Sequence, residues 1–434
     1  MARNEWGVSR AGQGLARLCM AGVLLLLGAC ATGPKVEEVG SIAPPGVHRG
    51  IEITLLDSAT EKVVSQMTPD GRVHLVAITA GNEAYHVVVS AQGVERKERI
   101  GAKRYGYYDN LAITDDAQGR LHVALKDEHW ILEKGTWRLA GGNACSLLAR
   151  AGESMGCVVD VRGSELGTRG QWGASFIGGG FGAGIIIPYR IRPSKLVLAK
   201  ADGDDWSYRG VLDFHLPYLV NLSSNEGDTL AGDSSGTFHL IFRAHEPRFF
   251  HARYGALTWE EATTHDIEWR RPDGKAILLG NLRSVPATAG TGWFVASLAL
   301  AVDPRTGTAV FFARRSESGF AKATDAAVEI RDGVVGRPAP IPVKDTSPKK
   351  LAPAGDEQFH ALVAVRRNLF YMTYRADGWS APAGIGEFGT PSLFLIGDSS
   401  IQLASDGRRQ ALAVWPKHEG VLVGRWIELD ETSR

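Results

Sequence analysis

Side chains that could bind or transform a ligand occur in the irregular, polar segments of this 434-residue sequence. Histidine and tyrosine can transfer protons, and guanidinium groups hold carboxylates through paired hydrogen bonds. Taken singly, each such residue could equally be a solvated charge on the rim of a domain. As a set they predict a binding surface suited to an anionic ligand. The candidates are Tyr107, Tyr108, His129, Arg190, His245, Arg314, Arg366 and His418.

A serine motif and four recurrent histidines are further candidates. Gly232, Ser234 and Gly236 match the G-x-S-x-G pattern of a serine nucleophile, which requires a strand followed by a sharp turn into a helix. Here the pattern lies between two predicted strands, so we expect no catalysis by Ser234. The histidines open predicted strands, and we expect them to be packing residues of a repeat, with a catalytic ring as the alternative. They are His74, His122, His239 and His360.

Motifs for metals and cofactors are missing from the sequence. It contains no HExxH, no complete P-loop and no C-x-x-C pair. The glycine-rich run at residues 178–184 fails the spacing of a dinucleotide fingerprint and has no strand-helix context. We therefore predict no metal and no cofactor.

The elements that must position these side chains follow from a repeated phrase. An apolar strand ending in Leu-Ala precedes an acidic residue, a glycine-containing turn and a second strand that opens on His or Ala. Two more short strands with period-two alternation follow each phrase. Clear copies begin at Leu111, Leu148, Leu230, Leu300, Leu351 and Leu403, and an eroded copy begins at Val63.

Repeats of four strands are typical of a β-propeller. The sequence therefore predicts an all-β fold, a seven-bladed β-propeller of four-stranded antiparallel blades. The last copy has room for only three strands, while residues 51–56 are a spare strand at the other end. We expect this strand to complete the last blade and close the ring, which leaves no long free edge.

The first thirty residues resemble the leader of a bacterial lipoprotein. Three arginines precede an apolar run at residues 18–29, which is shorter than the roughly twenty residues needed to span a bilayer. Small residues before Cys30 match a lipobox, which implies that residues 1–29 are cleaved and that Cys30 carries the lipid. A plain signal peptide is the alternative. Ala31 favours the outer membrane, so we expect an anchor in the cell envelope facing the periplasm or the exterior.

The anchor divides the chain into parts. Residues 30–47 have the small, polar composition of a flexible tether, and residues 48–434 form the propeller domain. The domain keeps two cysteines, Cys145 and Cys157, on either side of a predicted hairpin turn. An exported compartment permits a structural disulfide between them, with two buried free thiols as the alternative.

One long insertion, at about residues 162–193, interrupts the third repeat and combines glycines with aromatic and aliphatic side chains. A loop this long is usually functional or disordered, so it could be a lid, a plug or a contact for membrane or partner. We expect ligands to bind on the face where the loops between second and third strands and the connections between blades converge, which we call the loop face, because propeller loops stand on a rigid scaffold.

The charge balance excludes one class of partner. The chain has 48 basic and 48 acidic residues and no long basic run, which argues against an electrostatic nucleic-acid binder. We expect a monomer held to the membrane at Cys30, with an anionic glycan or an envelope protein as its ligand.

Phrases at residues 71–76 and 119–124, GRVHLV and GRLHVA, resemble bacterial propellers of the sialidase-like and polysaccharide-lyase superfamilies. The Asp-box of sialidases is absent, so no catalytic residue carries over. In anchor and fold the chain also resembles propeller lipoproteins that assist outer-membrane protein assembly. Two functions follow as hypotheses: a binding or scaffold module acting through the loop face, or a polysaccharide lyase or glycoside hydrolase with its site on that face.

Overall fold

The structure is a computed structural model. It describes residues 47–106, 109–142, 145–162, 171–178, 184–191, 194–202, 205–212, 230–240, 267–270, 276–280, 293–316, 323–332, 334–389 and 400–430. All of them belong to one compact unit, residues 42–434. No helix in the described ranges is long and apolar enough to cross a membrane. Cys30, the leader, and nearly all of the tether lie outside the described residues.

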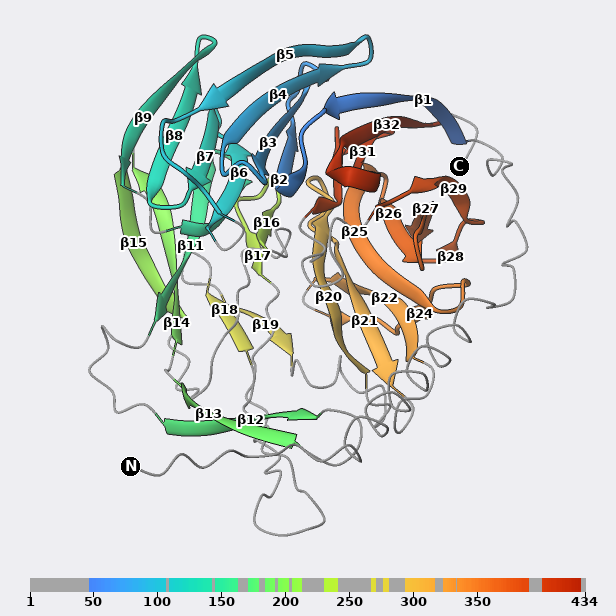
Figure 1. The fold of residues 1–434 in the computed structure, drawn as a ribbon. Helices are drawn as coiled ribbons and strands as arrows, with labels where there is room; N and C mark the ends of the chain where they lie inside the picture. Colours follow the sequence, from blue (N-terminus) through green and yellow to red (C-terminus); the bar gives the residue numbers. More distant parts are fainter. Residues whose placement is uncertain are drawn as a thin grey trace, which may run out of the picture. The chain divides into compact units, whose positions relative to one another are not determined.

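Three four-stranded antiparallel sheets follow one another in the N-terminal half (Figure 1). The first contains β2 (Thr60–Met67), β3 (Val73–Thr79), β4 (Ala84–Ser90) and β5 (Gly93–Ile100). The second contains β6 (Leu111–Asp115), β7 (Leu121–Leu125), β8 (Glu128–Glu133) and β9 (Thr136–Gly142). The third contains β10 (Cys145–Ala151), β11 (Ser154–Arg162), β14 (Ser194–Asp202) and β15 (Asp205–Leu212).

The predicted insertion leaves the third sheet between its second and third strands. Arg162 of β11 pairs with Ser194 of β14, so the sheet continues across the inserted segment. Within that segment β12 (Gln171–Gly178) and β13 (Gly184–Ile191) pair only with each other among the described strands. The insertion is therefore a separate hairpin and not part of the blade.

Two sheets in the C-terminal half depart from the predicted four strands, because two short strands share the fourth position. In one sheet β23 (Val334–Val335) and β24 (Ala339–Pro340) both pair with β22 (Ala323–Arg331), beyond β20 (Trp293–Val302) and β21 (Ala309–Ser316). In the next, β28 (Gly378–Trp379) and β29 (Ala383–Glu387) both pair with β27 (Asn368–Arg375), beyond β25 (Thr346–Gly355) and β26 (Gln358–Val365). Pro338 and Pro382 lie at the breaks, and proline has no N–H for the ladder.

Two smaller pairs of strands lie between these halves of the chain. The phrase at Leu230 forms β16 (Leu230–Gly232) and β17 (Phe238–Leu240), which pair with each other. β18 (Ile267–Arg270) and β19 (Ala276–Gly280) form a second two-stranded sheet.

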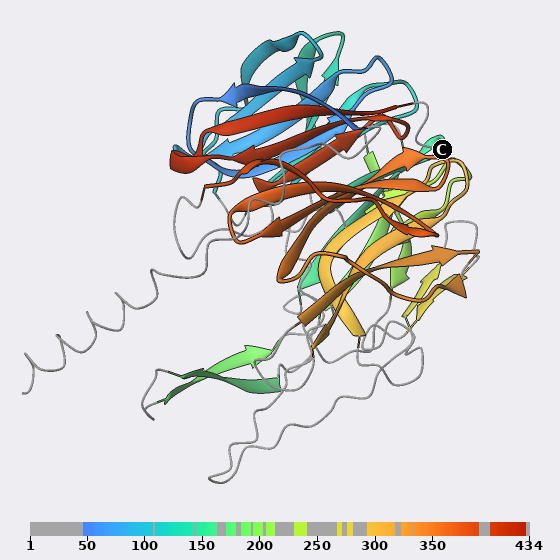
Figure 2. The same cartoon turned by 90° about the vertical axis from the view of Figure 1, so that its right-hand side faces the viewer.

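The two ends of the described chain meet in one sheet, as Figures 1 and 2 show. β1 (Val47–Leu56) pairs antiparallel with β32 (Leu422–Leu429), from Val47 opposite Leu429 to Leu56 opposite Leu422. The sheet continues through β31 (Gln410–Pro416) to β30 (Gln402–Ser405), and a short 3-10 helix, η2 (His418–Gly420), joins β31 to β32. β1 begins earlier than the predicted strand at residues 51–56.

The first strand of every phrase is the inner strand of its sheet, and these strands contact one another in succession. β2 contacts β6, and the series continues through β10, β16, β20, β25 and β30, which contacts β2 again. Each inner strand thus has a neighbour on both sides, which fixes the order of the sheets.

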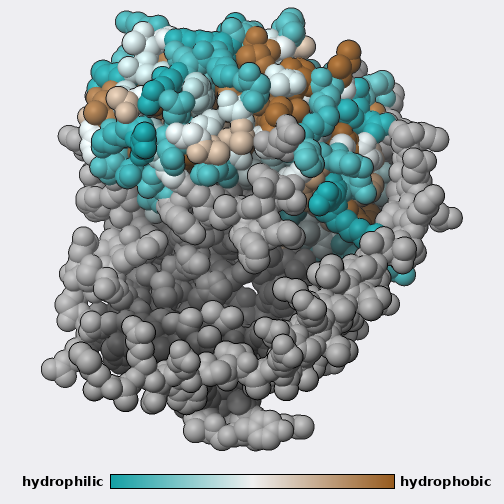
Figure 3. All heavy atoms as spheres, in the orientation of Figure 1, coloured by the Kyte–Doolittle hydropathy of each residue, from teal (hydrophilic) through white to brown (hydrophobic). Residues whose placement is uncertain are grey.

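Apolar residues fill the spaces between neighbouring sheets. Val63 and Leu412 belong to a cluster that joins the first sheet to the last, and Val76 and Val123 belong to one that joins the first sheet to the second. Because sheets cover both of its faces, β7 is buried along its whole length. Over the described residues the face seen in Figure 3 is largely hydrophilic, with separate apolar patches.

Candidate functional site

A cavity of about 640 Å³ lies between the inner strands. β2, β6, β10, β16, β20, β25 and β30 all contribute to its wall. Pro69, Gly152, Ser234, Pro304 and Gly407, from turns between first and second strands, also line it. The volume falls within the range of about 300–1,000 Å³ that is usual for small-molecule sites. We call it the axial cavity; it lies at the opposite end of the inner strands from the loops favoured by sequence.

Three polar side chains from three sheets converge in one part of this wall. Nε2 of Gln66 donates to Oδ1 of Asp115 at 3.1 Å, and Nη1 of Arg150 donates to Oδ2 of the same carboxylate at 2.9 Å. Nη1 and Nε of Arg150 also donate to the carbonyl oxygens of Asp116 and Gly152. Asp115 is buried and Arg150 is half-buried, so the ion pair is partly shielded from water. We call Gln66, Asp115 and Arg150 the polar triad.

The apolar part of the wall follows the repeat. The Leu-Ala pairs of the phrases supply it: Leu148, Ala149, Leu230, Ala231, Leu300, Ala301, Leu351, Ala352, Leu403 and Ala404. The polar triad was not predicted from the sequence, because functional residues were expected in loops and the triad lies on strands. A signal was present, however, since Arg150 follows Leu-Ala where other copies have Gly232, Val302, Pro353 or Ser405.

A second pocket, of about 790 Å³, lies beside the first at the same end of the sheets. Asp116, Arg120, His122 and Glu153 contribute to its lining. Asp116 accepts from Nε of Arg120 at 2.7 Å and lies 3.1 Å from Nε2 of His122. Burial acts to raise the pKa of Asp116, but hydrogen bonds from His122 and Arg120 outweigh it and hold that pKa below its usual range. The carboxylate therefore favours its charged form, and its hydrogen bonds stay within the β6–β7 turn and the start of β7.

The residues predicted from the sequence fall into four groups. Tyr107, Tyr108 and His245 lie outside the described residues. Arg190 is in β13 and Arg314 in β21, and only their backbones are described. Arg366 and His418 are exposed, in the β26–β27 turn and in η2, both of which join a second strand to a third. His129 instead is buried at 2% exposure.

The recurrent histidines make contacts inside their own sheets. Nδ1 of His122 lies 3.0 Å from Nε2 of His129, and the two rings stack. Nδ1 of His74 lies 2.9 Å from Nε2 of His86. Burial, and then the nearby His86, lowers the pKa of His74 to about 4.

The other two recurrent histidines, His239 and His360, are also buried. Nε2 of His239 lies 3.3 Å from Oδ2 of Asp233, and Nδ1 of His360 lies 2.6 Å from the hydroxyl of Tyr371. Burial lowers the pKa of His360 to about 3. All four histidines thus occupy positions in the packing of their blades.

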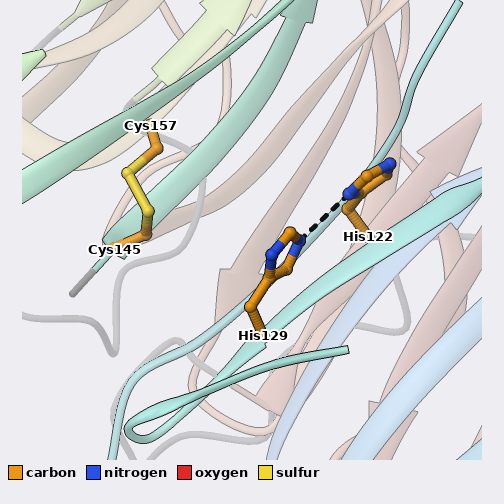
Figure 4. The surroundings of a disulfide bond; sticks show 4 residues. All are labelled: His122, His129, Cys145 and Cys157. Atoms are coloured by element: carbon orange, nitrogen blue, oxygen red, sulfur yellow. Dashed lines mark hydrogen bonds between the residues drawn. A yellow bond between two sulfur atoms is a disulfide. The ribbon is translucent and has the colours of Figure 1, made fainter. Parts of the chain in front are cut away.

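Cys145 and Cys157 form the predicted disulfide, drawn in Figure 4 together with His122 and His129 of the preceding sheet. Their Cα atoms are 5.6 Å apart on β10 and β11. The bridge belongs to a small apolar cluster with Ala112 and Ala124, so it links the third sheet to the packing of the second.

The G-x-S-x-G pattern lies in the turn between β16 and β17, as predicted, and no helix follows it in the described chain. The carboxylate of Asp233 accepts from the Ser235 and Thr237 backbone N–H groups, and the Ser234 N–H donates to the Pro304 carbonyl. Ser234 thus helps to join neighbouring sheets. No group of three or more potential metal ligands occurs among the described residues.

Comparison with known proteins gives similarity of fold. A scan against protein-family models finds no match, and a search of curated proteins finds none. The chain is similar to the BP39L lectin of Burkholderia pseudomallei, at 11% identity and a TM-score of 0.47, over 86% of this chain and 96% of that one. It is similar to an ulvan lyase of polysaccharide lyase family PL25, at 10% and 0.44, over 91% and 96%.

A third similarity is to the β-propeller domain of Cps50 (Swd1) from Myceliophteria thermophila, at 10% identity and a TM-score of 0.45, over 87% of this chain and 99% of that one. Over the described residues the chain is an all-β protein of antiparallel sheets.

Proposed function

We propose that this protein is a lipid-anchored β-propeller of a bacterial cell envelope that serves as a binding or scaffold module for a glycan or protein ligand. In this proposal the lipid is carried by Cys30 and residues 48–434 form a seven-bladed ring completed by β1. The succession of contacts among seven inner strands, and the pairing of β1 with β32, support the ring. A rigid ring leaves its loops free to vary and to bind.

One observation supports placing the ligand on the loop face, the end of the sheets where second strands turn into third strands. The β12–β13 hairpin, the exposed Arg366 and the exposed His418 all lie in such connections. Each therefore emerges at the same end of its own sheet. An arginine here could hold a carboxylate through two hydrogen bonds, so an anionic glycan is the favoured small ligand.

The binding proposal is tested on a glycan array that includes uronate and sialate ligands. Deletion of residues 165–187 is expected to abolish binding while the melting temperature stays near that of the wild type, because the hairpin lies outside the blade. Arg314→Ala with Arg366→Ala should weaken binding similarly, and Arg337→Ala, exposed between β23 and β24, is the control. Binding that survives both changes would place the site elsewhere, and cleavage of an array ligand would favour the enzyme hypothesis.

The anchor is tested separately. Cys30→Ser should release the protein from the membrane fraction and abolish incorporation of labelled fatty acid. Unchanged lipid labelling would contradict the lipoprotein assignment without bearing on the ligand.

A further inference from the structure

The axial cavity departs from the repeat on one side, and this asymmetry indicates a specific ligand. Residues that recur in most blades serve the fold in each of them. Gln66, Asp115 and Arg150 do not recur, although they occupy inner strands like the Leu-Ala pairs. The recurrent Leu and Ala give the cavity apolar surface, and Gln66, Asp115 and Arg150 add polar groups held by their own hydrogen bonds. A small-molecule site uses both kinds of group.

Packing alone gives no reason to place a charged pair there. Removing carboxylate and guanidinium groups from water costs free energy that their attraction repays only with good geometry. Asp115 accepts hydrogen bonds from both Gln66 and Arg150, and the positive charge of Arg150 compensates its negative charge. The cluster thus holds polar groups in fixed positions toward the cavity.

The triad also presents atoms that its own bonds do not use. No described residue donates to Oε1 of Gln66, and Nη2 of Arg150 donates to none, since the contacts of these side chains run through Nε2, Nη1 and Nε. An acceptor on the first sheet and a donor on the third are thus left unused, on either side of Asp115. A hydroxyl group is both donor and acceptor, so a pair of hydroxyls on adjacent carbons would suit these two atoms.

The charges of the lining do not favour an anionic ligand. Arg150 offsets Asp115, while Asp406 accompanies the exposed Arg408 at the rim, and Asp233 is bonded within its own turn. With no excess of positive charge, the cavity offers no net attraction to an anion. This sets it apart from the arginine-bearing loop face at the other end of the sheets.

We propose that the axial cavity is a binding site for an uncharged, polyhydroxylated ligand, a neutral mono- or disaccharide or the neutral end of a glycan. Gln66 and Arg150 hold adjacent hydroxyls, Asp115 fixes both side chains, and the Leu-Ala wall contacts the C–H face of the sugar ring. The site is independent of the loop face.

The experiment is saturation-transfer NMR on the full-length protein in detergent. The probes are glucose, galactose, mannose and fucose, their neutral disaccharides, and glucuronate as the charged comparison. At least one neutral sugar is expected to bind, and glucuronate more weakly.

The diagnostic variant is Asp115→Asn with Arg150→Gln, which removes both charges together and leaves neither buried alone. Loss of hydrogen bonds from a charged donor should weaken sugar binding roughly 10- to 100-fold. Gln66→Met, which retains the ion pair, is expected to weaken it about tenfold. The matched control is Arg305→Gln, which removes an exposed arginine paired with Asp356 outside the cavity lining. It should bind like the wild type.

Several outcomes would overturn the proposal: no response from any neutral sugar, equal binding by the double variant, or equal loss in the double variant and in Arg305→Gln. If the double variant melts well below the wild type, Gln66→Met decides between loss of fold and loss of site. Sugar binding that is lost instead in Arg314→Ala with Arg366→Ala would overturn the axial site and support the loop face.

Discussion

The sheet β6–β9 and the sheet β25–β29 carry the same phrase but satisfy its histidine differently. In the former, His122 lies between Asp116, at 3.1 Å, and His129, at 3.0 Å. In the latter, His360 lies 2.6 Å from the Tyr371 hydroxyl, and its phrase carboxylate, Asp356, turns away to Arg305.

Turn length explains this difference. Asp116 opens a long turn that closes through Gly119 at φ 75°, and its carboxylate accepts from the Gln118 and Arg120 N–H groups. Asp356 and Glu357 instead form a two-residue turn with φ of 52° and 57°, as hairpins favour. The short turn carries Asp356 outward, away from His360. The same phrase thus gives a network with a carboxylate in one sheet and a histidine–tyrosine contact without one in another.

Neighbouring packing differs in the same way. The sheet β25–β29 is flanked by two large apolar clusters, to which Phe359 and Leu362 belong. On its side toward the third sheet, β6–β9 has a small cluster that includes the Cys145–Cys157 disulfide. Hydrogen bonds and a disulfide therefore stabilise the packing of β6–β9 against the third sheet. Burial of apolar side chains stabilises the packing of β25–β29 against its neighbours.

The largest expected effect is in the apolar blade. Phe359→Ala removes a fully buried ring and is expected to lower the free energy of unfolding by about 3–5 kcal/mol. Denaturant titration gives the value. Leu139→Ala on β9, whose side chain is 48% exposed, is the control and should change stability by under about 0.5 kcal/mol. Similar losses of stability in Phe359→Ala and Leu139→Ala would contradict the role given to apolar burial in β25–β29.

The disulfide comes next. Cys145→Ser with Cys157→Ser should cost about 3 kcal/mol, because the unfolded chain regains the freedom of the short closed loop. Differential scanning calorimetry should show the same lower melting temperature for the variant and for wild type under reductant. A melting temperature that neither treatment alters would mean that the bridge adds nothing to stability.

The phrase carboxylates give a matched pair of smaller effects. Asp116→Asn weakens four hydrogen bonds to a buried group and should cost about 1–3 kcal/mol. Asp356→Asn breaks an exposed ion pair and keeps a residue type that tolerates positive φ, so it should cost under about 0.5 kcal/mol. Thermal melts of the two variants side by side measure the difference; equal shifts would contradict the account from turn length.

The last prediction is a dependence of stability on pH. Burial holds the pKa of His360 at about 3, against about 6.5 in an unfolded chain. Between these values the unfolded state binds the proton first, so stability falls as pH falls from about 6.5 toward 3, by up to about 1.4 kcal/mol per pH unit. His360→Leu with Tyr371→Phe should give a shallower slope in acid titrations of the melting temperature. An unchanged slope would assign the effect to other groups.

Local patterns were sufficient to predict much of the fold. The Leu-Ala phrases predicted the inner strands, and Gly119 and Gly236 take the positive φ expected of turn glycines. The hairpin between Cys145 and Cys157 was likewise a short-range feature. The splitting of the fourth strands was not predicted, although Pro338 and Pro382 marked both places.

The candidate site was harder to predict, because its residues come from three sheets. Gln66, Asp115 and Arg150 are ordinary polar residues of strands until the packing of three sheets brings them together. His129 was expected in a loop, but register places it one residue inside β8, beside His122.

By itself, the sequence determined the period of the strands, the turns and the placing of two cysteines on either side of a hairpin turn, because these depend on neighbours within a few tens of residues. Tertiary structure alone decided which polar groups lose contact with water. Lys62 shows this: it is 1% exposed with Nζ 2.8 Å from the Asp109 carbonyl, and burial lowers its pKa to about 7, against the opposing charge of Asp109. Desolvation depends on every sheet packed around a group, and no local pattern contains that information.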